Sequence, residues 1–306
     1  MALIKSIAEL RKYAKISASK DWDTYAMFVE DAQEKYLEPY FGFELLQSLD
    51  DKPLDPLTIH LCRSLGPFSL ALATDEMSIQ FGETGHTVAR TENLAPASDA
   101  KIEKARKSLY ERGWSNLEKS INYVREHQIA YPEWSESVFA KQSKTLLFDT
   151  PESFQENGLV NIDYSSLTFF MLRQLILRIE KTETLMLLPD EIRASVLNNR
   201  IDELPKTLVD ALLAYTASRV ASVYTSNSSL EQRTKSDFTE YNPVILPLYE
   251  DSDDSGNFFE RQADYWKSQI ANLLVSSGLV TDDYRQLKFN NATRKIFVAG
   301  ATRDEI

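Results

Sequence analysis

Hydrophobic residues recur at helical spacing along most of the chain. The first apolar series comprises Ile4, Ile7, Leu10 and Tyr13. Ser6, followed three residues later by Glu9, forms the pattern of a helix capping box. Because residues three and four apart share one face of an α-helix, the pattern predicts a short first helix. A polar break from Ser17 to Lys20 follows, and a second helix is predicted from Asp21.

The stretch EKYLEPYFGFELLQSL, Glu34 to Leu49, interrupts this second helix and then resumes the apolar pattern. Proline lacks a backbone N–H and glycine favours turns. We therefore expect Pro39 to end the helix and a short helix to run from Phe41 to Leu49, so that the stretch forms a corner. The aromatic residues of this corner that are candidate interface residues are Tyr36, Tyr40 and Phe41.

A second group of elements completes the first half of the chain. The run from about Pro56 to Phe81 is apolar on most sides, which predicts a buried helix kinked at Gly66 and Pro67. The segment Gly82 to Asp99 is polar and aperiodic, and long loops of this kind are often functional or order against a partner. Its candidate interface residues are Gly85 and His86. A long amphipathic helix is predicted from Ala100 to about Gln128.

The sequence changes character between Glu133 and Tyr164, where turn residues interrupt the helical pattern. Thr145 to Phe148 has the composition of a strand. We place the domain boundary here. The predicted organisation is a helical domain at 1–140, a linker at 141–164 and a second helical domain at 165–306.

The second half repeats the plan of the first. A helix from Ser165 to Leu187 is halted by Pro189, a short helix follows, and an apolar helix begins near Lys206. A polar segment, Thr225 to Asn257, then precedes a final long helix. The candidate interface residues in this region are Tyr241 and Phe258, and a strand is expected at Lys295 to Ala299.

The two halves align at an offset of about 150 residues, a typical domain length. Leu57 falls near Leu208, and Trp114 falls on or beside Trp266. The fold class predicted is mainly α, with helical bundle domains, an internal duplication and a few short strands in the linking segments. The alternative is that helical proteins align loosely with themselves without a duplication.

Composition narrows the class of protein. The chain has 306 residues, of which 43% are hydrophobic, and its formal net charge of −12 repels nucleic-acid phosphates and anionic membranes at long range. Tight non-specific DNA binding is therefore not expected. Cys62 is the single cysteine, which excludes an internal disulfide and favours a reducing cytoplasm. The N-terminus lacks the pattern of a secretion signal, and no apolar window approaches the length of a membrane-spanning helix.

The sharpest metal-binding pattern is DSDDSGNFFERQ, Asp251 to Gln262. Asp251, Asp253 and Ser255 occupy oxygen-ligand positions of a calcium loop, and Gly256 stands at its sixth position. Gln262 occupies the twelfth position, where a bidentate carboxylate is needed. We expect these acids to stabilise the N-terminus of the following helix, with a calcium site as the alternative.

No other residue pattern indicates chemistry. The three histidines, His60, His86 and His127, are far apart in sequence, and no nucleophile elbow, phosphate loop or dinucleotide fingerprint is present. We therefore expect no catalytic residue, no cofactor and no metal. The four tryptophans lie on apolar faces or near helix ends and are interpreted as core or interface anchors.

The N-terminal fifty residues resemble a family of uncharacterised proteins from phages and prophages of gut bacteria. The resemblance rests on ALIKSIAELRKYAKIS and on the corner pattern, with matching positions Tyr36, Leu37, Pro39, Tyr40, Phe41, Gly42 and Leu45. The pattern is also similar to the first helices of tailed-phage head-tail connector, or adaptor, proteins. This chain is about twice as long as small connectors, which a duplication would explain.

The resemblance implies a structural protein rather than an enzyme. It implies a homo-oligomeric ring between portal and tail proteins, assembled in the bacterial cytoplasm and located in the virion. From the acidic composition and the lack of a long apolar window we expect no sequence-specific nucleic-acid binding and no membrane association. Two alternatives stay open from the sequence. One is a metal-dependent hydrolytic enzyme using Glu83, His86 and the Asp251 loop. The other is a monomeric binding or regulatory module of a mobile element.

Overall fold

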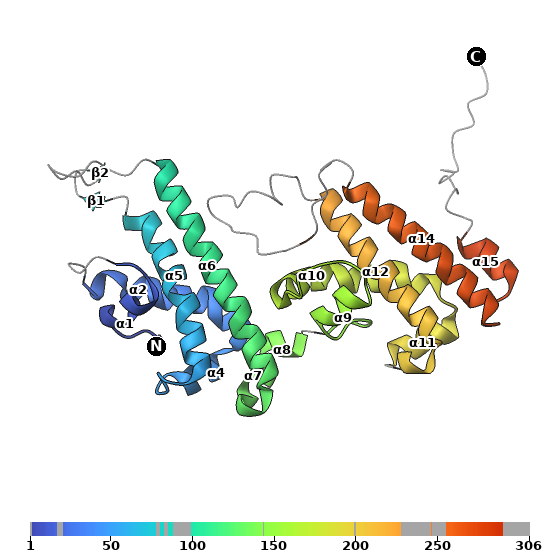
Figure 1. The fold of residues 1–306 in the computed structure, drawn as a ribbon, viewed down its shortest axis with the longest axis horizontal. Helices are drawn as coiled ribbons and strands as arrows, with labels where there is room; N and C mark the ends of the chain where they lie inside the picture. The colour runs from blue at the N-terminus through green and yellow to red at the C-terminus, as the bar shows by residue number, and fades with distance from the viewer. Residues whose placement is uncertain are drawn as a thin grey trace, which may run out of the picture. The chain divides into compact units, whose positions relative to one another are not determined.

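Helices make up nearly all of the regular structure in the described residues (Figure 1). The computed structural model describes residues 2–16, 21–77, 80–82, 85–87, 99–142, 144–198, 200–227, 246 and 255–289. The expectation of a mainly α protein built from helical bundles is confirmed. The chain divides into two compact units. Unit 1 contains Met1–Lys144 and Ser165–Met171, and unit 2 contains Thr145–Tyr164, Leu172–Asn227 and the described part of Leu246–Ile306.

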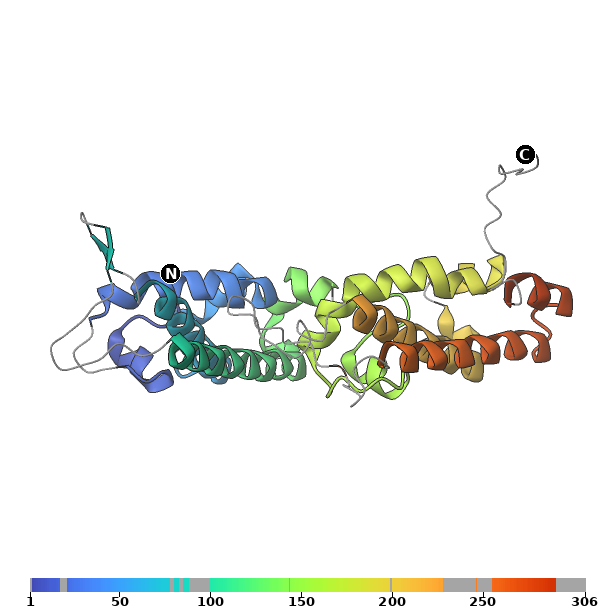
Figure 2. The ribbon, with the colours of Figure 1, turned by 90° about the horizontal axis from the view of Figure 1, so that it is seen from above.

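Unit 1 is built around two long helices, α5 (Pro56–Met77) and α6 (Asp99–Glu126). These helices lie side by side and run in opposite directions (Figures 1 and 2). The preceding elements are α1 (Ile7–Tyr13), α2 (Asp23–Ala32), the π-helical turn η1 (Gln33–Leu37), α3 (Glu38–Phe41) and α4 (Phe43–Leu49). The following elements are η2 (Gln128–Ala130), α7 (Pro132–Ser135) and α8 (Val138–Gln142).

The cap of α1 forms as its sequence predicts. The Ser6 hydroxyl accepts a hydrogen bond from the Glu9 N–H at 3.3 Å. The Glu9 carboxylate accepts the N–H of Lys5 at 2.7 Å, one residue before the position expected for a capping box. Two donors at the start of the helix are thus satisfied by side chains.

The corner differs from its prediction at Pro39. The helical path of α2 continues through η1 and α3, so Pro39 lies in the first turn of α3 and does not end the helix. The wider π turn accommodates this, because it shifts the hydrogen-bond register just before a residue that has no N–H to donate. The helix ends at Gly42, whose φ of 79° and ψ of 153° are accessible essentially only to glycine.

Aromatic rings fill the core of unit 1. Tyr36 of η1 stacks on Phe68 of α5, with ring centroids 4.2 Å apart, and meets Trp114 of α6 edge to face at 5.8 Å. The Tyr36 hydroxyl donates to the Tyr110 hydroxyl at 3.4 Å. Offset and edge-to-face pairs of this kind add stability beyond the area they bury. The rings therefore connect η1 to both long helices.

A short hairpin follows α5. The helix ends at Met77 and not near Phe81. The strands β1 (Gln80–Gly82) and β2 (Gly85–Thr87) pair antiparallel, with Phe81 opposite His86. This part of the predicted loop therefore contains regular structure.

Unit 2 is built around α12 (Lys206–Asn227) and α14 (Ser255–Ser276), which also lie side by side in opposite directions. Its other elements are α9 (Pro151–Glu156), η3 (Glu180–Thr184), η4 (Leu185–Leu187), α11 (Asp190–Leu197), η5 (Ile201–Glu203) and α15 (Asp282–Phe289). Helix α10 (Ser166–Ile179) begins among the residues of unit 1 and ends among those of unit 2.

Polar contacts join η3 to α12 in unit 2. Arg219 donates from Nε to Glu183 Oε2 at 2.7 Å and from its NH2 group to Oε1 at 3.2 Å. The buried hydroxyls of Thr184 and Thr216 lie 2.8 Å apart. At the corresponding place in unit 1, η1 is held by aromatic stacking. The two units therefore use different chemistry for the same contact.

The order of elements recurs between the units. In each unit a helix passes into a π turn, a short turn and a short helix, and then into a 22-residue helix, α5 or α12, followed by a long partner helix. Trp114 and Trp266 lie in the two partner helices. The recurrence supports the predicted duplication, whose evolutionary origin stays a prediction.

The predicted linker is structured. Thr145 to Phe148 is a turn and not a strand, because its amides bond to a buried carboxylate instead of to a partner strand. Phe148 and Phe154 are fully buried, with ring centroids 5.1 Å apart. Residues 145–164 thus contribute to unit 2. The strand expected at Lys295 to Ala299 lies outside the described residues, and α15 was not predicted.

Candidate interaction surfaces

The three aromatic corner residues proposed as interface residues are buried. Tyr36, Tyr40 and Phe41 have side chains in the core of unit 1. Burial raises the pKa of the Tyr40 hydroxyl to about 12. These side chains therefore stabilise the corner from inside and do not face a partner. Periodicity alone did not distinguish them from Phe43, the next aromatic residue, which is exposed.

Four exposed apolar side chains gather at one end of unit 1. We call Phe43, Leu54, Ile129 and Val138 the end patch. Phe43 lies in α4, Leu54 in the turn after α4, Ile129 in η2 and Val138 in α8. Helix α7 contacts α4, η2 and α8. The turn after α4 lies at the same end of the α5–α6 pair (Figure 1). Ile129 is 100% exposed and Leu54 is 87% exposed. Exposed apolar side chains on neighbouring elements of a folded protein are candidates for a contact surface.

Specific contacts hold the end patch in place. The Trp134 indole Nε1 donates to the backbone carbonyl of Tyr40 at 3.2 Å, joining α7 to the corner. The Tyr131 hydroxyl donates to Asp55 Oδ1 at 2.8 Å, which joins the residue after η2 to the residue before α5. A Cβ on Gly42 would lie 3.4 Å from Ser137 Cβ, so Phe43 and Val138 flank a close contact. These contacts hold α7 and α8 against the corner, whereas Leu54 and Ile129 stand in exposed stretches.

The other predicted interface residues have different outcomes. Gly85 and His86 lie in β2, where their backbones pair with Gly82 and Phe81. Tyr241 lies outside the described residues. Phe258 is described at the start of α14, and it lines a pocket in unit 2.

This pocket, which we call the Trp266 pocket, has a volume of about 280 Å³. It is lined by Leu159, Val160, Asn161, Ser218, Phe258, Phe259, Gln262 and Trp266. Pockets for drug-sized ligands measure roughly 300–1,000 Å³, so this pocket suits a smaller group, such as one large side chain or a small ring. Its lining is uncharged, with aromatic walls and amide, hydroxyl and indole groups. Such a pocket can accept one neutral, mainly apolar group.

Two neighbouring positions shape the loop at the pocket wall. Gly158 is buried against α12, and a Cβ there would lie 2.3 Å from the Phe154 carbonyl oxygen and 2.6 Å from Ala217 Cβ. Leu159 has a φ of 60° and is mostly exposed. Left-handed backbone is unfavourable for a branched residue and persists only where its surroundings hold it. Here the Gln155 side-chain oxygen accepts the N–H groups of Ile162 and Tyr164.

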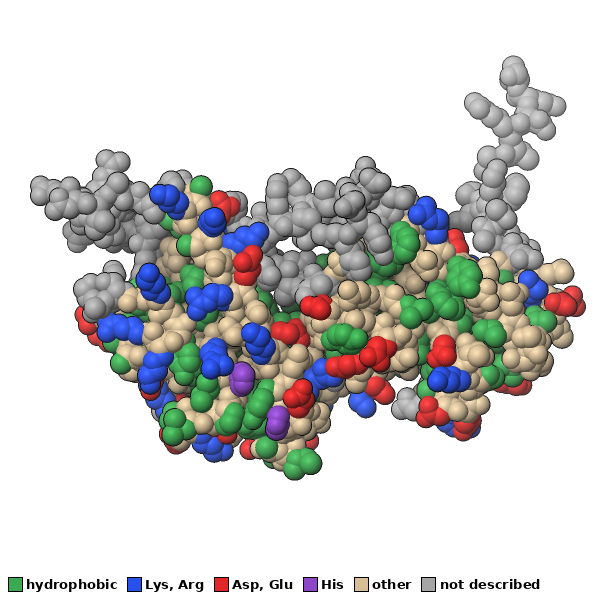
Figure 3. Space-filling view, viewed as in Figure 1, with side chains coloured by type: hydrophobic (Ala, Val, Ile, Leu, Met, Phe, Trp, Pro, Cys, Tyr) green, Lys and Arg blue, Asp and Glu red, His purple; other side chains and the backbone are tan. Residues whose placement is uncertain are grey.

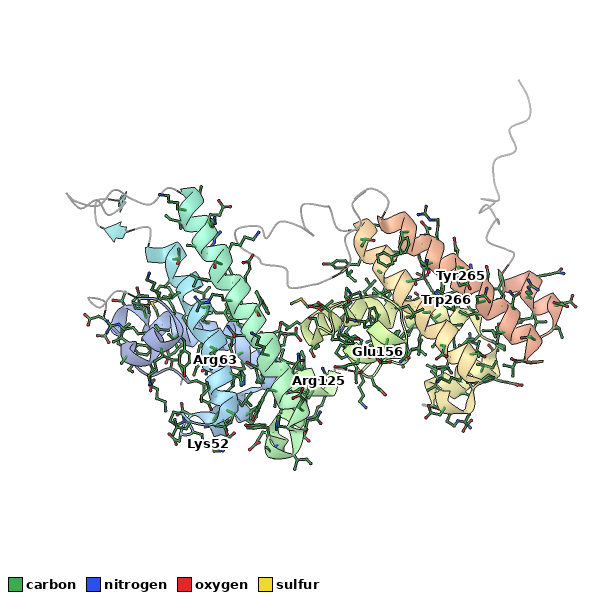
Figure 4. All side chains as sticks on the ribbon, in the orientation of Figure 1. Lys52, Arg63, Arg125, Glu156, Tyr265 and Trp266 are labelled. Carbon is green, nitrogen blue, oxygen red and sulfur yellow. The ribbon has the colours of Figure 1, made fainter. Side chains whose placement is uncertain are left out.

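Figure 4 shows Tyr265 and Trp266 as neighbours on α14. The Tyr265 side chain is exposed, whereas Trp266 is half-buried and lines the pocket. In the described part of the chain, the Trp266 Nε1, the Ser218 hydroxyl and the Gln262 amide have no hydrogen-bond partner. Polar groups of this kind are available to orient a bound group.

Two glutamates organise backbone segments. In unit 1, Glu118 of α6 accepts the N–H groups of Ser166 and Leu167 at 2.7 and 3.1 Å, which caps α10. In unit 2, buried Glu180 accepts the N–H groups of Leu146 and Leu147, each at 3.0 Å. Burial raises the pKa of Glu180, although the hydrogen bonds oppose this shift. Both roles are structural.

The residues considered as alternatives for a metal site can be placed in part. Among the residues that the structure describes, no three His, Cys, Asp or Glu side chains come together as metal ligands. Asp251 and Asp253 lie outside those residues, and Ser255 begins α14. Burial raises the pKa of the Cys62 thiol to about 12, which suits an inert core residue.

The rings of two histidines stack on the ring of one tyrosine. Because the two histidines are far apart in sequence, the pattern did not predict this cluster. His60 and His127 both stack on Tyr123, with ring centroids 5.2 and 4.2 Å apart. Burial, together with the charges of Arg63 and Lys119, lowers the pKa of His60. This environment favours the neutral ring near neutral pH.

The class of protein defined by these features is a mainly α protein of two helical units with exposed apolar side chains at one end of unit 1. Residues 25–143 match the model of a family of unknown function, DUF6712. The match covers unit 1 from α2 to α8 and includes the whole end patch. No curated protein and no solved structure matches the chain significantly. None of the helices described has the length and apolar character needed to span a bilayer.

Sequence reasoning missed the end patch and the Trp266 pocket. Phe43 and Val138 were visible as apolar residues beside breaks in the pattern, but their exposure depends on how α4 and α8 pack. Leu54 lies in a turn and Ile129 in the short 3₁₀ helix η2, where an apolar residue fits no periodic face. The one signal of the end patch available in the sequence was an apolar residue within a polar turn.

Proposed function

We propose that the protein is a structural component of a tailed-phage virion, a head-tail connector that assembles into a homo-oligomeric ring and contacts portal and tail proteins. The observation that carries the proposal is the end patch. Its four apolar side chains are exposed, although buried Tyr131, Trp134 and Phe139 anchor the elements that carry or adjoin them. Isolated exposed apolar residues are ordinary, whereas a group held at one end of a unit favours a protein contact. No catalytic step is part of this proposal.

The resemblance of the corner sequence to head-tail connectors supports the same class. The residues that carry the resemblance, among them Tyr40, Phe41 and Gly42, build the framework beneath the end patch. A sequence pattern that fixes a corner would therefore also fix the surface beside it. The net charge of −12 keeps separate copies soluble before assembly.

A ring needs two different surfaces on each subunit. In a heterologous contact, one surface of a subunit binds another surface of the next, and repetition closes the ring. The end patch belongs to unit 1 and the Trp266 pocket belongs to unit 2. In our proposal an apolar side chain of the end patch enters the Trp266 pocket of the neighbouring subunit. The pocket volume of about 280 Å³ suits one such side chain.

Mass photometry of the purified protein tests assembly. We expect discrete particles whose masses are multiples of 35.0 kDa, and rings by negative-stain electron microscopy. The double variant Phe43→Glu/Ile129→Glu should be monomeric, because a charge in an apolar contact is strongly unfavourable. Met27→Glu is the matched control, since Met27 is an exposed apolar residue of α2 outside the end patch. It should assemble like the wild type.

The possible outcomes test ring formation and the proposed contact separately. A wild-type protein that stays monomeric, alone and with portal or tail proteins, would contradict the connector function. Rings that persist in the double variant would reject the end patch only. Mixing that variant with Trp266→Ala should give dimers but no rings, because such a mixture retains one intact pair of surfaces.

A further inference from the structure

A line of cationic and hydroxyl-bearing side chains runs along the exposed face of α6. Its members, at successive spacings of three or four residues, are Lys101, Lys104, Ser108, Arg112, Ser115, Lys119 and Tyr123. Residues at this spacing lie on one face of a helix. All but Tyr123 are exposed, and Tyr123 is half-buried. We call this line the α6 stripe.

Helix α5 adds charge beside the stripe. The Arg63 side chain is exposed, and the Arg63 carbonyl accepts a hydrogen bond from Asn116 of α6 at 3.3 Å. Figure 3 shows Lys and Arg side chains gathered over α5 and α6, and Figure 4 labels Arg63 there. Arg112 reaches α1, where it donates to the Tyr13 carbonyl at 3.0 Å. The cationic surface therefore extends across more than one helix.

These cations are not neutralised by carboxylates. In the described part of the chain, Lys101, Lys104, Arg112, Lys119 and Arg63 form no ion pair. Glu111 lies at the border of the stripe, and Glu126 follows its end. The protein as a whole has a net charge of −12. At physiological salt, charges more than about 8–10 Å away are largely screened, so the local surface decides what binds.

We propose that the α6 stripe binds the sugar–phosphate backbone of a nucleic-acid duplex without reading its sequence. The stripe from Lys101 to Lys119 spans roughly 27 Å at about 1.5 Å per residue. That length approaches one turn of B-form DNA, about 34–36 Å. Lys, Arg, Ser, Asn and Tyr are the side chains that commonly contact phosphates. The inference does not depend on ring formation.

The surface suits a nucleic acid better than a protein partner. Protein interfaces have a core of apolar and aromatic anchors from which charged residues are depleted. The described side chains of α5 and α6 include no exposed large apolar residue. Single-strand sites use several aromatic platforms for stacking, whereas the stripe has only Tyr123, which His60 and His127 already contact. A duplex backbone fits these features.

Fluorescence anisotropy with labelled DNA and RNA duplexes two helical turns long tests the proposal on the full chain. Affinity should fall steeply between about 50 and 200 mM salt, with a log–log slope of roughly −4 to −5 if five phosphates are contacted. Different base sequences should bind equally. Comparing the RNA duplex with the DNA duplex shows whether the contact requires DNA. Binding to either duplex supports the proposal.

Lys101→Glu/Lys119→Glu should weaken binding at least tenfold and reduce the slope by about 2. Lys206→Glu/Lys288→Glu makes the same change in net charge on exposed lysines of unit 2 and should bind like the wild type. Circular dichroism checks that both variants fold. Equal loss in the two variants, or no binding at the lowest salt, would overturn the proposal. Binding of poly-glutamate without binding of either duplex would overturn it in favour of an acidic protein partner.

Discussion

The carboxylate of Glu180 accepts a hydrogen bond of 2.7 Å from the hydroxyl of Thr145, across 35 positions of the chain. Together with the N–H groups of Leu146 and Leu147, this donor wraps the turn that opens unit 2 around one buried side chain. Buried backbone donors require partners. The contact therefore explains why a stretch with strand composition forms a turn.

Glu180→Gln should lower the free energy of unfolding by about 2–3 kcal/mol. Glutamine has one acceptor oxygen, and its NH2 group would face a backbone N–H. Chemical denaturation measures the change. Glu156→Gln is the control, because Glu156 is an exposed glutamate of α9 (Figure 4). A loss no larger than that of the control would contradict the role of Glu180.

The raised pKa of Glu180 predicts how its contribution changes with pH. Because burial raises the folded pKa above the ordinary value of 4.5, the folded state binds this proton more tightly than the unfolded state. The contribution of Glu180 to stability is therefore full below pH 4.5 and declines as pH rises through the folded pKa. Glutamine does not titrate. The difference in stability between wild type and Glu180→Gln should thus be larger near pH 5 than near pH 8, measured by urea denaturation at each pH.

Gly42→Ala should destabilise unit 1 by about 1–3 kcal/mol, because alanine is strained at this backbone conformation. Gly278→Ala is a matched control at another positive φ, 68°, where a Cβ would have no neighbour within 4 Å. Its cost should be about 1 kcal/mol. Pro39→Ala should change stability little, since Pro39 lies in the first turn of α3. Thermal denaturation ranks the three variants, and a larger effect at Pro39 than at Gly42 would contradict our description of the corner.

Gly158→Ala should displace the loop that forms one wall of the Trp266 pocket. Its Cβ would overlap the Phe154 carbonyl oxygen and Ala217, and such overpacking typically costs about 1–3 kcal/mol. Labelling with fluorotryptophan gives a ¹⁹F resonance for Trp266, assigned with Trp266→Phe. We expect that resonance to shift and those of Trp22 and Trp134 in unit 1 to stay unchanged. An unshifted Trp266 resonance in a destabilised variant would show that the loop does not shape the pocket.

Periodicity predicted most helices because their apolar faces are regular. The Ser6 cap and the helices that became α6, α11 and α12 needed only local pattern and composition. Pro39 was misjudged because helix-breaking rules assume an α-helical register, whereas η1 is a π turn. Thr145 was misjudged because its partner, Glu180, is distant in sequence.

Surfaces were harder to predict than helices. Tyr36 and Phe43 both belong to the aromatic corner, yet one is buried and the other exposed. Only packing against α5 and α6 distinguishes them. The spacing of Lys101, Arg112 and Lys119 was readable from the sequence, but the net charge obscured it. A total charge describes long-range repulsion and does not describe any one face.

The π turns η1 and η3 have a consequence for how this chain can change over time. Each places five residues where an α-helix uses fewer per turn. The five residues of a π turn cover about the same rotation as four residues of an α-helix. Deleting one exposed residue such as Glu34 would therefore leave a uniform α-helix, with Tyr40 at nearly its present orientation toward the core. Deleting one residue within α2 would instead rotate everything beyond it by about 100°. The π turn is thus the place in this helical path where the corner best tolerates the loss of a residue.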